Sequence, residues 1–211
     1  ILAENSPYYE TGVKIGYTSE SGEWYLAGMY LNGWQRIEKV EGNQTPAFGT
    51  QVTYKPSDRV ALNWSTYVGN EQPGIDKKWR YFNNFYGQFK VTEKTNVTAG
   101  FDVGSQQSAK NSNKYDTWFS PVLILQYKPT DKIQLAARGE YYSDEKGVII
   151  ATETPNGFKT YGLSANFDYL VADNIIFRIE ARNLSSKDEI FTNKDNLPTD
   201  TNTFVTTSLA I

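Results

Sequence analysis

The chain has 211 residues, 31 of them aromatic, one Met, neither Cys nor His, and a formal net charge of −3. The absence of Cys and His excludes disulfides, zinc ribbons, iron–sulfur ligation and the Ser-His-Asp triad, and an isoelectric point near 5.1 argues against a nucleic-acid partner. Intrinsic disorder is also disfavoured, because Leu, Ile, Val and Phe make up about 23% of the chain and its net charge is small.

Segments in which every second residue is apolar or aromatic recur from one end of the chain to the other. In residues 59–69, for example, Val60, Leu62 and Trp64 alternate with small and polar neighbours. This period of two predicts β-strands with one apolar face, each about ten residues long, which is longer than the roughly five or six residues typical of soluble sheets. In chain order the predicted strands are 9–18, 23–33, 47–55, 59–69, 79–91, 96–104, 115–127, 132–142, 158–170, 174–184 and 202–211.

Short turns and long polar loops alternate between these strands. Short turns are predicted at 19–22, 55–58, 92–95, 128–131 and 171–174, and longer loops at 35–45, 70–78, 105–114, 143–157 and 185–200. No apolar run reaches the length of about 18 residues that a transmembrane helix needs. The layout is instead typical of an outer-membrane β-barrel, which has short periplasmic turns and long extracellular loops.

The fold class that follows is all-β, an antiparallel up-and-down transmembrane β-barrel forming one domain over residues 1–211. Eleven strands are predicted, whereas bacterial single-chain barrels close with an even number. We therefore expect the chain to be the C-terminal portion of a longer barrel with further strands upstream, and we see no signal peptide in it.

Aromatic residues gather near both ends of the predicted strands, which predicts two belts at the membrane–water interfaces. The alternative is that aromatic side chains simply favour strands in any β protein. The proposed belt at the short turns contains Tyr17, Trp24, Tyr54, Phe89, Tyr127 and Tyr169. The proposed belt at the long loops contains Trp34, Tyr67, Trp79, Tyr81, Tyr115, Trp118, Tyr141, Phe158 and Phe204.

The opposite parity of the strands is polar and of mixed charge, and we expect it to line a lumen. An ionised side chain on the lipid side would cost about 2–4 kcal/mol near the bilayer midplane, which favours the inward assignment. The densest charge cluster combines two residues of 132–142 with three of 174–184. It is interpreted either as a constriction that selects solutes or as a salt-bridge lattice that stiffens the wall. The candidate pore-lining residues are Arg138, Glu140, Arg178, Glu180, Arg182, Arg80, Lys90 and Asp102.

Residues 122–125 are apolar on both parities, which predicts either an inner segment covering part of the lumen or contact with a protein partner. A carboxylate pair such as Glu140 and Glu180 raises the question of glycoside hydrolysis, but inward-facing acids of a barrel explain them more simply. We therefore predict that the protein is not an enzyme, with no catalytic residues, no metal site and no cofactor.

Several short motifs, in their order and spacing, resemble the OmpL-like β-barrel porin family of Gram-negative outer membranes. The motifs are Pro7, Thr11-Gly12-Val13, Asn32-Gly33-Trp34, Arg138 to Tyr142 with Asp144 and Gly147, and Phe177 to Arg182. The resemblance implies an exported, multi-pass outer-membrane barrel with additional N-terminal strands. Such barrels usually end on an aromatic residue, whereas this chain ends Leu209-Ala210-Ile211.

Three functions remain open at this point. The preferred one is a porin-like channel for passive diffusion of small hydrophilic solutes or ions, with outer-membrane lipid as its surroundings. The second is a non-conducting outer-membrane barrel with a structural, adhesive or scaffolding role, whose loops bind a protein partner. The third is a soluble β-sandwich that binds a ligand, in which the apolar parity would form the core.

Overall fold

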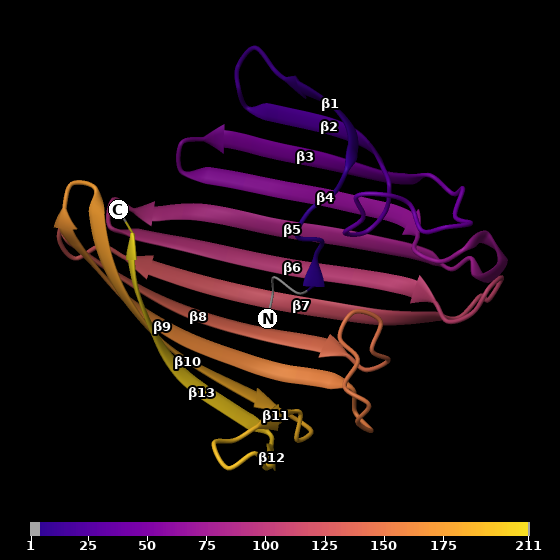
Figure 1. Ribbon diagram of the computed structural model, residues 1–211. Helices are drawn as coiled ribbons and strands as arrows, with labels where there is room; N and C mark the ends of the chain where they lie inside the picture. The colour runs from indigo at the N-terminus through magenta and orange to yellow at the C-terminus, as the bar shows by residue number, and fades with distance from the viewer. Residues whose placement is uncertain (1–4, 211) are drawn as a thin grey trace.

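The computed structural model describes residues 5–210 as one antiparallel sheet with the strands in almost sequential order, β1-β2-β3-β4-β5-β6-β7-β8-β9-β10-β13 (Figure 1). Among the described residues there is no helix long and apolar enough to cross a membrane. The strands of the sheet are β1 Gly12–Thr18, β2 Trp24–Leu31, β3 Ala47–Ser57, β4 Val60–Asn70, β5 Trp79–Thr92, β6 Thr95–Gln107, β7 Tyr115–Tyr127, β8 Ile133–Asp144, β9 Phe158–Ala172, β10 Ile175–Ser186 and β13 Thr201–Ala210.

All eleven predicted long strands are confirmed, and most of their ends lie within two residues of the prediction. The largest differences are β1, which begins three residues later than predicted, and β6, which extends three residues further. The predicted loop 185–200 contains a small hairpin of β11 (Phe191–Thr192) and β12 (Pro198–Thr199), and the loop after β4 contains a short 3-10 turn, η2 (Gly74–Asp76). Ile211, the end of the last predicted strand, lies outside the described residues.

The register of the sheet places the apolar parity on its outward, convex face. Directly paired residues of antiparallel strands point to the same side, so Val52, Trp64 and Phe85 form one outward row across β3, β4 and β5. Trp64 and Phe85 stack, and both remain more than 40% exposed. Within the described part of the chain no second layer covers this face, so the β-sandwich interpretation is wrong.

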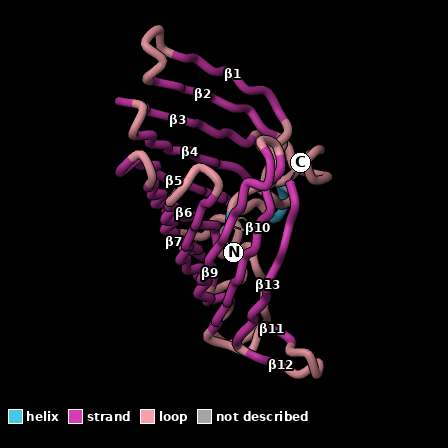
Figure 2. Tube along the Cα trace, turned by 90° about the vertical axis from the view of Figure 1, so that its left-hand side faces the viewer, coloured by secondary structure: helices cyan, strands magenta, loops and turns pink. Residues whose placement is uncertain are grey.

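The buried side chains lie on the opposite, concave face near the loop end of the sheet. Residues 5–11 and the loop 32–46 are positioned against this face (Figure 2). Trp34 of that loop makes edge-to-face contacts with Tyr67, Phe82 and Trp118, and the rings of Phe82 and Trp118 stack. The loop end of the concave face is therefore filled by an aromatic core.

A glycine makes this core possible. A Cβ atom on Gly104 of β6 would lie 2.0 Å from Cζ2 of Trp118, its neighbour on β7. The absence of a side chain at residue 104 thus lets the fully buried indole lie flat against the sheet.

The aromatic belts are only partly as predicted. At the short turns Tyr17, Trp24 and Tyr127 are exposed on the outward face, and Trp24 stacks on Tyr54 with centroids 4.2 Å apart. At the long loops Tyr81 and Tyr115 are likewise outward and exposed. Five residues predicted for the loop belt instead point inward by register or lie in the aromatic core. The belt was predicted from distance to a loop alone, without regard to which face of the sheet each residue occupies. The five are Trp34, Tyr67, Trp118, Phe158 and Phe204.

Candidate functional site

All eight candidate pore-lining residues lie on the concave face. The pairing Asn84 with Asp102, and Arg138 with Ser164 and Arg182, continues the inward rows from strand to strand. They do not form a single ring. Arg80 lies near the loop end of β5, whereas Lys90 lies near its short-turn end, so these charges are distributed along the height of the wall.

Glu140 is the centre of the densest network. Its carboxylate accepts hydrogen bonds from Nη2 of Arg138 at 2.5 Å and from Nη2 of Arg182, which reaches across from β10. The glutamate side chain is 1% exposed, whereas those of the arginines are 27% and 18% exposed. Gly162 lies between them on β9, and a Cβ atom there would come within 2.8 Å of Cγ of Glu140. The negative charge is therefore enclosed beneath two guanidinium groups.

Arg178 and Glu180 do not join this network. Arg178 binds Asp168 of β9 in a two-point pair, with Nε 2.7 Å from Oδ1 and Nη2 2.5 Å from Oδ2. Glu180 accepts a longer hydrogen bond, 3.4 Å, from Nδ2 of Asn166. The predicted five-residue cluster is thus divided into a Glu140 network, an Asp168–Arg178 pair and a Glu180–Asn166 contact, and Asp168 is the partner that the predicted cluster did not include.

Asp102 fixes the N-terminal segment to the wall. Its two carboxylate oxygens accept hydrogen bonds from Nδ2 of Asn84 and Nδ2 of Asn5, each at 2.5 Å. The indole Nε1 of Trp118 donates to the backbone oxygen of Asn5 at 3.3 Å. Val122 on the neighbouring strand is buried on the same face. The segment 122–125, whose residues are apolar on both faces, therefore lies near the place where the N-terminal segment contacts the inner wall.

Arg80 lies within the aromatic core. Its Cζ lies 5.2 Å from the Trp34 ring centroid and 5.8 Å from that of Trp118, within the range of cation–π attraction. Its Nε and Nη2 both donate to Oε1 of Gln106 on β6. Because Arg80 is buried, it supports the aromatic core more than it contributes to an accessible surface.

Glu71, which sequence reasoning missed, holds the loop 32–46 in place. Its Oε1 accepts a hydrogen bond from the backbone N–H of Trp34 at 3.0 Å and another from the Tyr67 hydroxyl, and its Oε2 lies 3.9 Å from Nε of Arg36. In the sequence Glu71 is one acid of a predicted polar loop. It belongs to no motif and has no distinctive spacing, so the sequence does not mark it. We refer to Glu71, Trp34 and Tyr67 as the loop latch.

At the short-turn end the charges are paired in solvent. Glu93 accepts from Nζ of Lys90 at 2.5 Å and from Nη2 of Arg59 at 2.8 Å. The hydrogen bond and charge of Lys90, and then those of Arg59, hold the pKa of Glu93 below its usual range. The Glu93 carboxylate therefore stays charged to a lower pH than that of an unpaired glutamate.

The exposed charge on the concave face is asymmetric. The carboxylates of Asp102, Glu140 and Asp168 are buried, whereas Lys14 and Arg178 are exposed. Among the described residues, Lys14 donates a 3.3 Å hydrogen bond to the amide oxygen of Gln51 and lies over the ring of Tyr25. The most exposed charges of this face are thus cationic, while Glu180 is half-buried.

Comparison with known proteins agrees with this architecture. The family model described as "Putative beta-barrel porin-2, OmpL-like" matches residues 1–211. No curated protein matches the chain.

Three solved outer-membrane proteins share the fold at low sequence identity. An anion-selective porin from Comamonas acidovorans has a TM-score of 0.71 at 8% identity, covering 98% of this chain and 64% of the porin. OmpT of Vibrio cholerae, in a trimer form, has a TM-score of 0.64 at 12% identity, covering 95% of this chain and 64% of OmpT. The outer-membrane channel DcaP of Acinetobacter baumannii has a TM-score of 0.61 at 14% identity, covering 93% of this chain and 61% of DcaP. The chain thus spans less than two thirds of the length of these proteins.

Proposed function

Since the chain belongs to the OmpL-like β-barrel porin family and is an outer-membrane β-barrel protein of Gram-negative bacteria, we propose that it forms the wall of a channel for passive diffusion of small hydrophilic solutes and ions, with a preference for anions. The role is non-enzymatic: the wall contributes a polar surface and a field. One structural neighbour is itself an anion-selective porin, which agrees with the proposal although its identity to this chain is 8%.

The observation that carries the proposal is the unequal exposure of inward charges. Rings of charged side chains select ions by the sign of the charge that they present to the lumen. Each acid of the Glu140 network and of the Asp168–Arg178 pair lies beneath an arginine, so its field is largely neutralised where it is buried. Arg178 keeps 48% of its side chain exposed while Asp168 keeps 10%, so this pair still presents a cation to the lumen.

A second candidate, a barrel that does not conduct and serves a scaffolding role, has one observation in its favour. The loop end of the concave face is filled by the aromatic core, with Trp118 completely buried and the latched Trp34 above it. Complete closure at this level would prevent conduction. The two candidates therefore differ in whether space remains beside the aromatic core.

Planar-bilayer recording of the full-length protein tests the proposal. We expect discrete conductance steps and, in a KCl gradient, a reversal potential of the sign that chloride preference produces. Arg178→Gln should move the permeability ratio towards unity, while Lys110→Gln, in the loop after β6, should leave it unchanged. Absence of current from well-folded protein would favour the non-conducting barrel, and cation preference in the wild type would overturn the assignment of anions.

A further inference from the structure

The outward face carries an unusual combination of features at the loop end of β8, β9 and β10. Here two lysines, an aromatic row and an apolar hollow follow one another down the strands. We propose that this surface binds a phosphate-bearing lipid of the surrounding leaflet, with the phosphate at the lysines and an acyl chain in the hollow. The proposal concerns the lipid-facing side and does not depend on conduction through the concave side.

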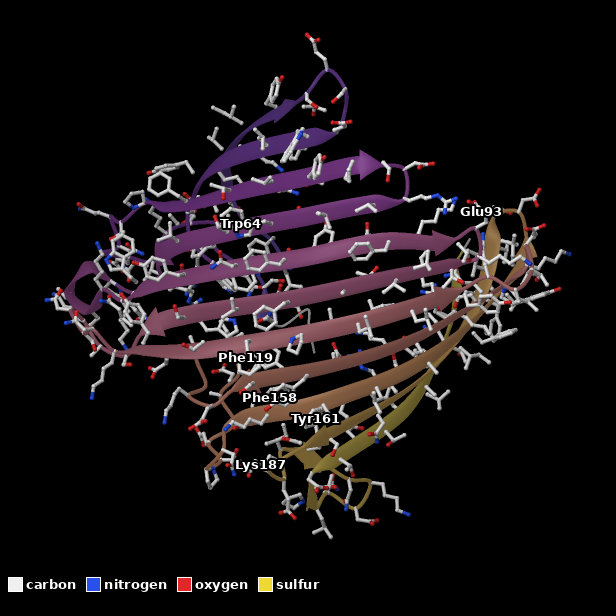
Figure 3. All side chains as sticks on the ribbon, turned by 180° about the vertical axis from the view of Figure 1, so that it is seen from behind. Trp64, Glu93, Phe119, Phe158, Tyr161 and Lys187 are labelled. Carbon is white, nitrogen blue, oxygen red and sulfur yellow. The ribbon has the colours of Figure 1, made fainter. Side chains whose placement is uncertain are left out.

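The lysines are Lys159 and Lys187. Lys159 pairs with Ser143 of β8 in an outward row, and the backbone N–H of Lys187 donates to the backbone oxygen of Lys159 at 3.0 Å, which continues that row beyond the end of β10. Figure 3 shows Lys187 at the loop end of the outward face, beyond Tyr161. An ammonium group at this height matches the phosphate level of a bilayer better than the hydrocarbon.

The aromatic row lies one step down the strands from the lysines. Phe101, Phe119, Tyr141 and Tyr161 contact one another in sequence across β6 to β9, with centroid separations of 6.2, 5.9 and 4.5 Å. Tyr161 is 63% exposed, and it lies with Phe119 on the face seen in Figure 3. Tyrosines at this level are typical of the membrane interface, where the ring is apolar and the hydroxyl reaches polar headgroups.

The hollow begins directly below Tyr141 and Tyr161. It has a volume of about 500 Å³, and its floor consists of small outward residues, whereas leucines form its sides. The floor is made of Ala137, Gly139, Ala165 and Ala181, and the sides of Leu123, Leu125 and Leu163. An open trough of this composition fits a hydrocarbon chain, because small residues and leucines offer it van der Waals contact. Asn183 and Thr203, which also line the trough, satisfy each other through a 2.7 Å hydrogen bond.

One of the two lysines is available to a phosphate, whereas the other is held by an acid. Glu145 takes up one lysine, since Nζ of Lys159 lies 2.7 Å from its Oε2. Asp188 is engaged by the backbone N–H and Nδ2 of Asn156, at 2.8 and 2.7 Å. Lys187 is exposed and makes no ion pair within the described part of the chain, so its ammonium group is available to an anion, with the exposed Glu189 two residues further along the loop.

A comparable hollow on the same face shows what is specific to this site. It has a volume of about 510 Å³ around Gly87 and Ala99, with Phe85, Phe89 and Phe101 among its lining residues. Neither hollow has a lysine among its lining residues, but Lys159 and Lys187 lie beyond the aromatic row at the loop end of the first. The second hollow therefore serves as a comparison for acyl-chain binding in the absence of the Lys159 and Lys187 pair.

Native mass spectrometry of the full-length protein in micelles with equal amounts of phosphatidic acid and phosphatidylcholine tests the site. We expect one phosphatidic acid to be retained in preference, by about fivefold, which is the contribution of one lysine near a surface. Lys159→Gln/Lys187→Gln should abolish the preference, while Lys110→Gln/Lys114→Gln should keep it. Inorganic phosphate at millimolar concentration should not compete, because the acyl chain contributes to binding.

The hollow is tested separately by filling it. Gly139→Leu should weaken retention, because a Cβ atom there meets only Leu163 at 3.6 Å and the larger side chain extends into the trough. Gly28→Leu, on the outward face of β2 with nothing within 4 Å of its Cβ, is the matched control, and heat-modifiable gel mobility verifies folding. Equal retention of both lipids by the wild type, or equal loss in the control variants, would overturn the proposal, as would full displacement by inorganic phosphate.

Discussion

Removing the carboxylate of Glu71 should release the loop 32–46 from the concave face. The Glu71→Ala variant loses the acceptor of two hydrogen bonds, from the Trp34 N–H and the Tyr67 hydroxyl, both in buried surroundings. Hydrogen bonds to a charged group contribute about 1.5–3 kcal/mol each, so the two together stabilise the latched loop by about 3–6 kcal/mol. Water that enters at the loop end replaces part of these hydrogen bonds. We therefore expect the free energy of latching to fall by about 3 kcal/mol, which is roughly a hundredfold in the equilibrium between latched and released loop.

Glu71→Gln separates the hydrogen bonds from the charge. The amide oxygen can still accept from Trp34 and Tyr67, but to a neutral acceptor each bond contributes about 0.5–1.5 kcal/mol. The attraction to the half-exposed Arg36 at 3.9 Å, worth less than about 1 kcal/mol, is also lost. We therefore expect Glu71→Ala to raise single-channel conductance and to shift tryptophan emission to longer wavelength as Trp34 becomes hydrated, with Glu71→Gln between it and the wild type. Unchanged conductance and emission in a folded Glu71→Ala protein would refute the latch.

Three further predictions follow from the wall and its loops. Ala165→Arg, at the middle of β9 on the outward face, should destabilise the inserted protein by about 2–4 kcal/mol in lipid-refolding titrations. Asn166→Arg, which changes the neighbouring inward residue beside Glu180, should be tolerated. Equal costs of the two substitutions would contradict the assignment of faces. Gly104→Ala should lower the temperature of the heat-modifiable transition by displacing Trp118, at a cost of about 1–3 kcal/mol, and Gly28→Ala should not. The pKa of Asp188 is held below its ordinary 3.8 by the hydrogen bond from the Asn156 N–H. The contribution of Asp188 to loop order is therefore present above pH 3.8 and is lost as the pH falls below that value. Hydrogen exchange of the Asn156 amide, corrected for pH, should accelerate in that window and become pH-independent in Asp188→Ala.

The strands were predictable because their signal is local and strong. Membrane-facing strands must present an apolar side chain at every second position, so Leu62 and Trp64 reveal both the strand and its face. The same rule assigned Arg138, Arg178 and the other candidate residues to the inner face, since placing any of them outward would expose a charge to hydrocarbon. Parity therefore carried the prediction from residue type to the side of the wall.

The pairing of these charges and the filling of the inner face were not predictable in the same way. Arg182 reaches Glu140 from a strand 42 residues later, which depends on the register of β8, β9 and β10 rather than on any spacing within one strand. Trp34 was predicted to lie in a belt because it follows a strand end. Its loop instead turns inward, where Glu71 accepts a hydrogen bond from the Trp34 N–H. Loops carry no period, so the direction in which they fold is decided by such single contacts.

The geometry also separates two roles that the sequence left together, stiffening of the wall and selection of solutes. Glu140 is enclosed by Arg138 and Arg182, and removing one arginine takes a charged partner away from a buried carboxylate, which costs stability. Arg178 is half exposed and its removal leaves Asp168 uncovered at the lumen, which changes the sign of the accessible charge. Arg182→Gln should therefore lower the transition temperature with little effect on the reversal potential, and Arg178→Gln should do the reverse. If both variants altered the same property alone, the division of the inner wall into a structural network and a selecting residue would have to be abandoned.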